Sequence, residues 1–459
     1  MTVSIEEYKK RIVQLEKKNK DLKVQVEELI RKNEKNEKVL SDLSIGTGAR
    51  ESRISSASKT LRYKMVTVLF SDVKGFTKLT GQMDAEALID ELDKFFFKFD
   101  EVVKKFNIEK IKSIGDTYMA AGGIPKKNRT NPVEVILAAI EMREYLRDLQ
   151  KEHAKHNIQV WDLTFGLHTG PVVAGVVGKK KISYEIKGDT VNIASRIESS
   201  SEVGKINISA MTYEFVKDYF ICEYRGKMPI KYMGDIDMYT VKSFRPELST
   251  DKKGLIPNKN FRTKFQLIRY DDLNEVVLDR LEQELPKYLF YHNLKHTIDV
   301  VIEVEIIGKG EGINEEELLL LKTAALFHDS GQIYGAKDHE DKSCEIAREI
   351  LPKYDYDEEQ INAICDIIMA TKLPPEPKTK LENIICDSDL DYLGRSDFIP
   401  VSNTLFKELA EQNIITDENE WNKMQVKFIS GHQYFTKTAN NLREVNKQKQ
   451  IDRIKSLIY

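Results

Sequence analysis

The stretch Val66-Thr-Val-Leu-Phe-Ser-Asp72-Val-Lys-Gly75-Phe-Thr77 carries the strongest indication of fold in this chain. Its β-prone residues predict a buried strand that ends in a carboxylate, and a Gly-Phe-Thr turn follows at once. A strand that delivers an Asp beside exposed backbone N–H groups can hold Mg²⁺ against a polyphosphate. An Asp after a single strand is more often a turn former, so the stretch needs support from elsewhere in the chain.

Two later segments supply that support. Ile114-Gly115-Asp116-Thr-Tyr predicts a hairpin turn with an Asp of its own, and Gly188-Asp-Thr-Val-Asn192-Ile-Ala-Ser-Arg196 predicts the start of a helix. Asn192 and Arg196 are four residues apart and therefore lie on one face of that helix. In type, order and spacing the three segments resemble the catalytic domain of the class III nucleotide cyclases, which includes adenylyl and guanylyl cyclases, over residues 62–245.

The resemblance implies two divalent ions, Mg²⁺ or Mn²⁺, in the cyclase site. One ion would activate the attacking 3′-hydroxyl and the other would steady the leaving pyrophosphate. Three groups would hold the ions, the carboxylates of Asp72 and Asp116 and the backbone of Val73. The turn that follows would bind the phosphates of the nucleotide through Gly75, Phe76 and Thr77.

Two further residues of the resemblance act from the partner subunit. Asn192 would orient the ribose, and Arg196 would stabilise the charge that develops on the phosphate. This chain has both halves of the site, so the resemblance implies a homodimer with two shared sites. A monomer would then have no complete site.

Base choice is expected at Lys112 and Glu185. An ammonium group can only donate a hydrogen bond, which suits N1 of adenine, whereas guanine requires an acceptor there. Glu185 can accept from the adenine amino group, although the family more often has the shorter Asp, or Thr, at this position. We therefore expect ATP as substrate, with GTP as the alternative. Lys231 is a candidate for contact with the terminal phosphates, or else an ordinary lysine at a strand edge.

Composition describes an ordinary protein surface. The chain has 459 residues, a net charge of -3 and 32% charged residues, so no bulk attraction to nucleic acid or to anionic membranes is expected. No run of about 18 apolar residues predicts a membrane span, and the charged N-terminus does not resemble a signal peptide. The chain has four cysteines, namely Cys222, Cys344, Cys365 and Cys386. They lack the spacing of a zinc site or of a disulfide framework. We expect a cytoplasmic protein.

Residues 1–45 carry a seven-residue apolar repeat that predicts a parallel coiled coil. Asn19 and Asn33 at one core position would fix the register of a dimer, although a single solvated helix is the alternative. This segment would support the homodimer together with the cyclase domain. A Gly- and Ser-rich linker is expected over residues 46–61.

The remaining pattern predicts one α+β domain and one helical domain. Strands are expected at 65–70, 108–113, 118–122, 163–168, 172–177 and 183–186, and helices at 85–106, at 132–153 and from residue 189. This order is that of a ferredoxin-like sheet. After a linker at 246–262, residues 263–459 are expected to be almost wholly helical.

The helical region contains a second cluster of metal-binding residue types. The segments Tyr291-His292-Asn-Leu-Lys-His296, Leu326-Phe-His328-Asp329 and Cys386-Asp387-Ser-Asp389 follow one another in order. Imidazoles and carboxylates together are ligands for ions that activate water. The order resembles that of the HD phosphohydrolase superfamily, and it implies one or two divalent ions held by His296, His328, Asp329 and Asp387, with His339 as a further candidate.

The Tyr-His-Asn opening resembles that of cyclic nucleotide phosphodiesterases, in which the histidine, here His292, is the general acid. The segment after the His-Asp pair departs from those enzymes, so other phosphate esters are also candidate substrates. A regulatory module that binds metal without turnover is the other interpretation. The leading hypothesis is thus an adenylate cyclase fused to an HD hydrolase, with a guanylate cyclase or a catalytically silent nucleotide-sensing scaffold as alternatives.

Overall fold

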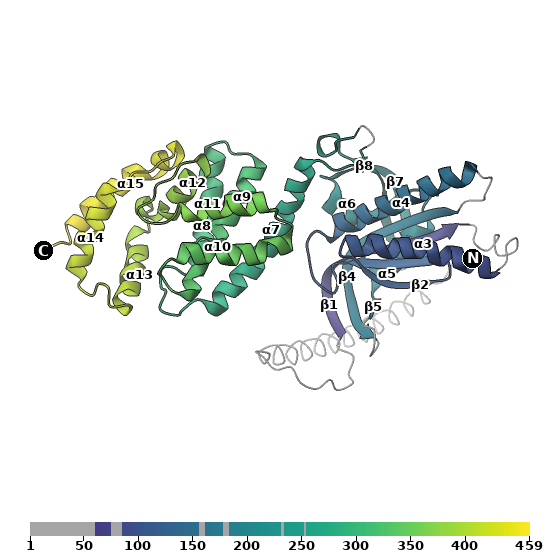
Figure 1. Cartoon of the computed structure of the whole chain (residues 1–459), viewed down its shortest axis with the longest axis horizontal. Coiled ribbons are helices and arrows are strands. Elements are labelled where there is room, and N and C mark those ends of the chain that lie inside the picture. The colour runs from purple at the N-terminus through teal and green to yellow at the C-terminus, as the bar shows by residue number, and fades with distance from the viewer. Residues whose placement is uncertain (1–59, 75–84, 156–160, 178–182, 231–233, 252–253) are drawn as a thin grey trace, which may run out of the picture. The chain divides into compact units, whose positions relative to one another are not determined.

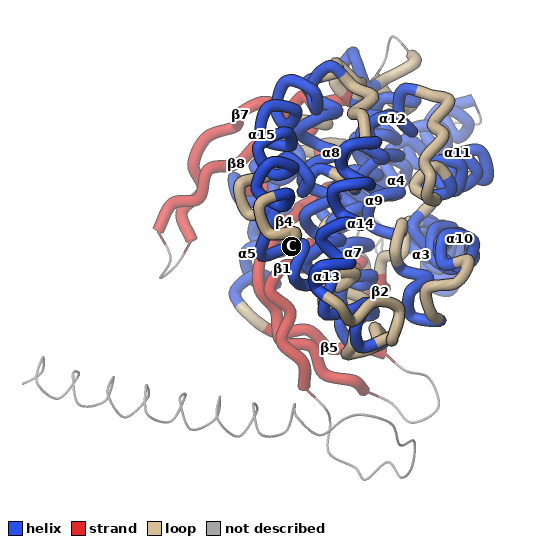
Figure 2. The backbone as a smooth tube through the Cα atoms, turned by 90° about the vertical axis from the view of Figure 1, so that its left-hand side faces the viewer, coloured by secondary structure: helices blue, strands red, loops and turns tan. Residues whose placement is uncertain are grey.

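The computed structural model describes residues 60–74, 85–155, 161–177, 183–230, 234–251 and 254–459 (Figure 1). The predicted coiled coil over residues 1–45 and nearly all of the predicted linker at 46–61 lie outside the described residues. Strands are confined to the first part of the described chain, and helices make up almost all of the rest (Figure 2). None of the helices in the described ranges is both long and apolar enough to cross a membrane.

The first four strands form the predicted ferredoxin-like sheet. They are β1 (Thr60–Lys74), β2 (Glu109–Ile114), β3 (Thr117–Gly122) and β4 (Asp162–Val177). Their order in the sheet is β2-β3-β1-β4, and each neighbouring pair is antiparallel. Two helices complete the motif, α3 (Ala85–Lys105) after β1 and α4 (Asn131–Lys155) after β3.

One expectation about this sheet was wrong. Residues 163–168 and 172–177 were expected to be separate strands, but they form the single strand β4. The register with β1 shifts between Tyr63 and Val66, opposite Val172 and Gly170. Pro171 lies at this irregularity, where its missing N–H leaves no gap in the hydrogen-bond ladder. The strand therefore continues through a Gly-Pro pair that, in the sequence, predicts a break.

Alternate residues of β1 pack into separate cores on the two faces of the sheet. Leu69 and Val73 belong to the core that includes Phe99 of α3 and Ile136 of α4. Val68 belongs to the opposite core, with Ala194 of α5 (Asp189–Ser199). Because side chains in a strand alternate between faces, this pattern places Asp72 on the same face of the sheet as Val68, the face that α5 covers.

The sheet continues beyond the predicted strands. β5 (Ser183–Lys187) was expected and pairs with β4. Four later elements were not expected, namely β6 (Ile206–Ser209), α6 (Ala210–Val216), β7 (Phe220–Ile230) and β8 (Gly234–Phe244). β6 runs parallel to β4, and the order on this side is β4-β6-β8-β7. β7 and β8 carry many exposed polar residues, so they lack the clean alternation that predicts a strand.

The region after residue 258 is helical, as predicted. Its helices are α7 (Lys259–Glu284), α8 (Leu294–Gly310), α9 (Glu315–Phe327), α10 (His339–Ile350), α11 (Glu358–Met369), α12 (Lys380–Asp389), α13 (Phe398–Glu411), α14 (Glu418–Gly431) and α15 (Lys437–Lys455). One large apolar core joins α7 to α12, and a smaller one lies between α13, α14 and α15. This bundle places the histidines of the second cluster on the ends of α8, α9 and α10.

Candidate active sites

Asp72 and Asp116 come together at one end of the ferredoxin-like sheet. Asp72 is paired in register with Thr117, whose hydroxyl donates to Oδ1 of Asp72 over 2.9 Å. The backbone N–H of Val73 donates to the carbonyl of Asp116 over 3.2 Å. Burial, and then the neighbouring charge of Asp72, raise the pKa of the Asp116 carboxyl above its ordinary value. Two neighbouring carboxylates of this kind suit a divalent cation between them.

Among the described residues, Lys74 is the cation that pairs with Asp72. Its ammonium lies 3.4 Å from Oδ2 of Asp72 and 3.3 Å from Oε1 of Glu198. Glu198, on α5, is buried, and the hydroxyl of Thr164 donates to the same oxygen. Burial opposes the charge of Lys74, but the carboxylates of Glu198 and then Asp72 outweigh it and raise the pKa of this lysine. Neither Lys74 nor Glu198 was predicted as a site residue.

Asn192 and Arg196 lie on one face of α5, as their spacing predicted, and both are exposed. The opposite face of this helix is buried through Ile193, Ala194 and Ile197. Within the described part of the chain, neither Asn192 nor Arg196 has a hydrogen bond or ion pair with Asp72 or Asp116. Their side chains are thus free to meet another molecule.

The predicted base-reading residues lie on two elements that touch. Lys112 is exposed on β2, and Glu185 is exposed on β5, which contacts β2. Glu185 lies 3.4 Å from the ammonium of Lys187. The predicted phosphate-binding residues Gly75, Phe76, Thr77 and Lys231 lie outside the described residues.

The second site gathers His296, His328 and Asp329, as the sequence predicted. Ligand atoms of these three residues all lie within 4.8 Å of one another. Nε2 of His328 is 3.2 Å from Nε2 of His296, and Oδ2 of Asp329 is 3.5 Å from both nitrogens. His296 begins α8, whereas His328 and Asp329 follow the end of α9.

The fourth residue at this cluster is Asp389, and the prediction of Asp387 is corrected. Oδ1 of Asp389 lies 3.0 Å from Nε2 of His296 and 3.5 Å from Nε2 of His328. The carboxylate of Asp387 instead accepts hydrogen bonds from the backbone N–H groups of Phe435 and Thr436 and from the Thr436 hydroxyl. Two residues along a helix differ by about 200° in direction, so Asp387 points away from the histidines.

His339 lies on the other side of Asp329. Its Nε2 is 3.2 Å from Oδ1 of Asp329, so the two oxygens of this carboxylate face different imidazoles. Burial opposes the charged form of both His328 and His339, but the neighbouring carboxylates outweigh it and raise each pKa to about 9. A bound ion would displace these protons, because metal ligands must be deprotonated.

The donor set fits a divalent ion. Oδ2 of Asp329 is buried and has no hydrogen-bond donor within the described residues. A buried carboxylate oxygen of this kind is costly unless a cation binds it. Imidazole nitrogens with carboxylate oxygens are the ligands that Zn²⁺, Fe²⁺ and Mn²⁺ accept. His296, His328, Asp329 and Asp389 would hold such an ion, and Asp329 with His339 could share a second one.

His292 is held by Glu408, which the sequence analysis missed. Nδ1 of His292 is hydrogen-bonded to Oε1 of Glu408, a buried residue of α13 (Phe398–Glu411). The other oxygen of Glu408 accepts the backbone N–H groups of Tyr291, at 2.8 Å, and of His292, at 3.1 Å. Burial opposes the charge of His292, but the hydrogen bond that its ring donates to Glu408 and the surrounding carboxylates outweigh this effect and raise the pKa of His292. No local signal could have found Glu408, since 116 residues separate the pair.

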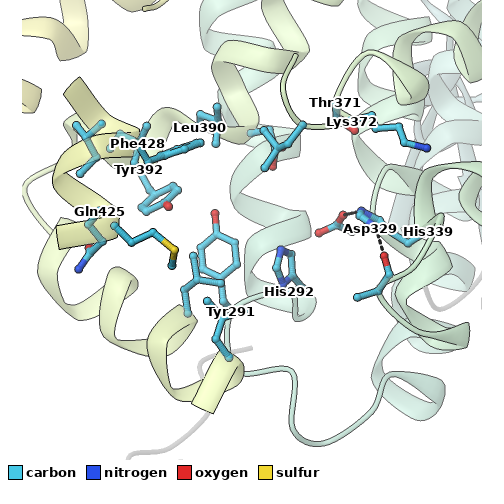
Figure 3. A pocket seen from close by; sticks show the side chains of 18 of the residues that line it. Tyr291, His292, Asp329, His339, Thr371, Lys372, Leu390, Tyr392, Gln425 and Phe428 are labelled. Carbon is cyan, nitrogen blue, oxygen red and sulfur yellow. Dashed lines mark hydrogen bonds and ion pairs between the residues drawn. The ribbon is translucent and has the colours of Figure 1, made fainter. Parts of the chain in front are cut away.

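A cavity of about 460 Å³ opens beside the second cluster. In Figure 3, Asp329, His339 and Lys372 lie at one end, and Tyr392, Gln425 and Phe428 lie at the other, with His292 and Tyr291 between them. One end of the cavity is therefore charged, and the other is mainly apolar. Such a cavity can hold a phosphate ester with its phosphate toward the histidines and its organic group toward α14.

Comparison with known proteins agrees with both predicted domains. Residues 59–243 match the family described as the adenylate and guanylate cyclase catalytic domain, and residues 293–391 match the HD domain. An adenylate cyclase of Mycobacterium tuberculosis is 36% identical over 173 residues, which make up 38% of this chain and 38% of the relative. The human guanylyl cyclase C is 33% identical over 189 residues, 40% of this chain and 17% of the relative. The matched region thus spans 38% or less of the length of these two relatives.

Among solved structures, the adenylyl cyclase CyaB from P. aeruginosa is 32% identical, with a TM-score of 0.39, and the match covers 42% of this chain and all of that one. The order of the three cyclase segments, the HD cluster and the two family matches agree with one another. The chain therefore contains an adenylate and guanylate cyclase catalytic domain over residues 59–243 and an HD domain over residues 293–391.

Proposed function

We propose that the first domain converts ATP to 3′,5′-cyclic AMP and pyrophosphate. The observation that carries this proposal is the closeness of Asp72 and Asp116 at the end of the sheet, where the backbone N–H of Val73 donates to the carbonyl of Asp116. Exposed Asn192 and Arg196 on α5 add to it. Two divalent ions held by Asp72, Asp116 and the backbone of Val73 would supply the charge that activates the 3′-hydroxyl and steadies pyrophosphate. Arg196 would stabilise the additional negative charge of the phosphate in the transition state.

The site is completed by a second copy of the chain. Asn192 and Arg196 have no partner at Asp72 or Asp116 in their own chain, and a two-fold dimer can bring them to the carboxylates of the other copy. Each dimer would then have two equivalent sites, and each site would take residues from both subunits. The predicted coiled coil would raise the effective concentration of the two cyclase domains.

Adenine is the proposed base because Lys112 can donate to N1 and Glu185 can accept from the amino group. Both side chains are exposed on neighbouring elements, so a base could reach them together. Guanylate cyclase remains the second candidate, since the curated relatives include enzymes of both names. Exchange of both readers, Lys112→Glu with Glu185→Cys, should shift preference toward GTP, because an unmatched polar group costs about 1–3 kcal/mol.

The decisive experiment incubates the purified chain with ATP or GTP and Mn²⁺ or Mg²⁺ and identifies the products by mass. We expect cyclic AMP from the wild type and none from Asp72→Asn or Asp116→Asn, because each substitution removes a charged ligand. Asp93→Asn is the matched control, since Asp93 is an exposed carboxylate on α3. Cyclic GMP formed faster than cyclic AMP would overturn the choice of base, and full activity in Asp72→Asn would overturn the site.

For the HD domain we propose hydrolysis of a phosphate ester, with a cyclic nucleotide as the first candidate. A divalent ion at His296, His328, Asp329 and Asp389 would activate water. His292, kept protonated and oriented by Glu408, would donate a proton to the leaving oxygen. At the apolar end of the cavity, the rings of Tyr392 and Phe428 offer stacking surface to a purine, and the Gln425 amide offers a hydrogen-bonding group.

This second activity is tested in a chain whose cyclase site is inactive. The Asp72→Asn protein is incubated with cyclic AMP, cyclic GMP and a panel of phosphate monoesters in the presence of Mn²⁺. We expect hydrolysis of at least one substrate that is lost in His328→Ala. A wild-type domain that binds metal but hydrolyses nothing in the panel would make the HD domain a regulatory module.

A further inference from the structure

Lys74 links the two halves of the cyclase site within one subunit. It lies two residues after Asp72, and its ammonium is shared between the carboxylates of Asp72 and Glu198 at nearly equal distances, 3.4 and 3.3 Å. Glu198 is on α5, the helix that carries Asn192 and Arg196. The side chain of Lys74 is 36% exposed, whereas that of Glu198 is 7% exposed. The lysine can therefore move, and the glutamate is fixed.

Packing holds Glu198 in place. The hydroxyl of Thr164, on β4, donates to the carboxylate oxygen that also faces Lys74. Gly166 allows the backbone of Glu198 to approach β4 so closely that a Cβ at residue 166 would overlap it. The negative charge of Glu198 is thus held at a fixed point near the edge of the proposed metal site.

The position of Lys74 conflicts with metal binding. A monovalent cation that neutralises Asp72 would repel a divalent ion placed on the same carboxylate. The lysine must then leave Asp72 when the ion binds, and Glu198 is the partner already within reach.

We propose that the Lys74 ammonium is an internal cation that competes with the divalent ion for Asp72, and that Glu198 retains the ammonium when the ion binds. This inference rests on the proposed metal role of Asp72. Lys74 is a positioning residue in this account: it sets the metal concentration at which the site fills. Because Glu198 is on α5, filling of the site by metal also strengthens a contact to the helix that serves the other site of the dimer.

The test is a titration of the full-length chain with Mn²⁺ alone, in which free Mn²⁺ is measured by electron paramagnetic resonance. The HD domain also binds Mn²⁺ in the proposed scheme, so the cyclase component is the binding that Asp72→Asn abolishes. Lys74→Met should tighten this component by about tenfold, and Glu198→Gln should weaken it by about threefold. Lys74→Arg, which keeps the charge, should behave as the wild type.

Loss of any nearby charge also shifts cation binding, so two controls separate that effect. Lys64→Met removes an exposed lysine from the same strand and should leave the affinity within twofold. In the Lys74→Met background, Glu198→Gln should have little further effect, because its partner is already gone.

The outcomes are distinct. A wild-type chain with no component that depends on Asp72 would overturn the proposed metal site itself. A component that is present but unchanged or weakened by Lys74→Met would overturn only the competition by Lys74. Effects of Lys74→Met and Glu198→Gln that simply add in the double variant would show that Glu198 acts by charge alone and not through the lysine.

Discussion

Oδ1 of Asp389 lies 3.0 Å from Nε2 of His296, whereas the two oxygens of Asp387, two residues earlier, accept the backbone N–H groups of Phe435 and Thr436 just before α15. The two carboxylates should therefore respond differently to substitution. Asp389→Asn should weaken metal binding to the HD domain at least about tenfold, because it removes a charged ligand. Asp387→Asn should leave metal content unchanged but lower the free energy of unfolding by about 1–3 kcal/mol, because buried hydrogen bonds are lost.

Metal content by mass spectrometry and unfolding by denaturant distinguish the two effects. Asp391→Asn is not a suitable control, since Asp391 pairs with Arg443. Asp366→Asn, which changes an exposed carboxylate on α11, serves instead. Loss of metal in Asp387→Asn with normal binding in Asp389→Asn would reverse the assignment.

The pair of His292 and Glu408 predicts an effect on turnover without an effect on metal. Glu408→Gln keeps an acceptor for the two backbone N–H groups but removes the charge that holds the proton on His292. The rate constant kcat for hydrolysis should fall about 100-fold, as should that of His292→Ala, while bound metal stays constant. Glu411→Gln, at the exposed end of the same helix, should be normal. Additive losses in the double variant would show that the two residues do not act as a unit.

Features that follow a short period along the chain could be predicted from the sequence. The four-stranded ferredoxin-like order followed from strand and helix periods, and the observed strand order β2-β3-β1-β4 confirms it. The cluster of His296, His328 and Asp329 followed from short segments that resemble the HD superfamily, and the structure brings these three residues together. Local spacing carries both kinds of signal.

The missed features depend on contacts between distant residues or on the phase of a helix. Asp-Ser-Asp at 387–389 offers two equivalent carboxylates, and only the docking of α12 determines which one faces the histidines. Lys74 and Glu198 are separated by 124 residues and have no shared local pattern. β7 was missed because exposed charges interrupt its apolar alternation.

Close packing of α5 on β4 predicts that Gly166 cannot be replaced. A Cβ at this position would overlap the backbone of Glu198, which cannot move without displacing α5. Gly166→Ala should therefore lower the free energy of unfolding by about 1–3 kcal/mol and reduce cyclase activity through the shifted Arg196. Gly175→Ala is the matched control on the same strand, because nothing lies within 4 Å of its added Cβ. Equal stability of the two variants in chemical denaturation would contradict the prediction.

His168 predicts a loss of stability in mild acid. Burial lowers its pKa to about 4, whereas an unfolded histidine titrates near 6.5. Between these values the unfolded chain binds the proton and the folded chain does not, so stability falls as the pH decreases from about 6.5 to about 4. At pH 5 the contribution of this residue should be about 2 kcal/mol against folding, relative to pH 7.

Unfolding by urea at pH 7 and pH 5 measures this contribution by comparison with His168→Asn, in which the titrating group is absent. The variant should lose less stability between the two pH values than the wild type does. His432, whose pKa burial also lowers to about 4, is present in both proteins and cancels. Equal pH dependence of the two proteins would show that His168 can be charged in the folded state.

Arg196 is exposed and has no ion pair with Asp72 of its own chain. This arrangement predicts complementation between two inactive chains. Asp72→Ala and Arg196→Ala proteins should each fail to make cyclic AMP, because every site of either homodimer lacks one group. In a heterodimer, one of the two sites combines the intact Asp72 of one chain with the intact Arg196 of the other. Random co-assembly should therefore restore about a quarter of wild-type activity, since half of the dimers are mixed and half of their sites are complete.

Co-expressed chains with separate affinity tags allow the heterodimer to be purified and assayed. The control is Asp72→Ala paired with Asp116→Ala, which should stay inactive because both changes fall in the same half of the site. An inactive heterodimer of Asp72→Ala with Arg196→Ala would mean that the two groups do not meet across a subunit interface.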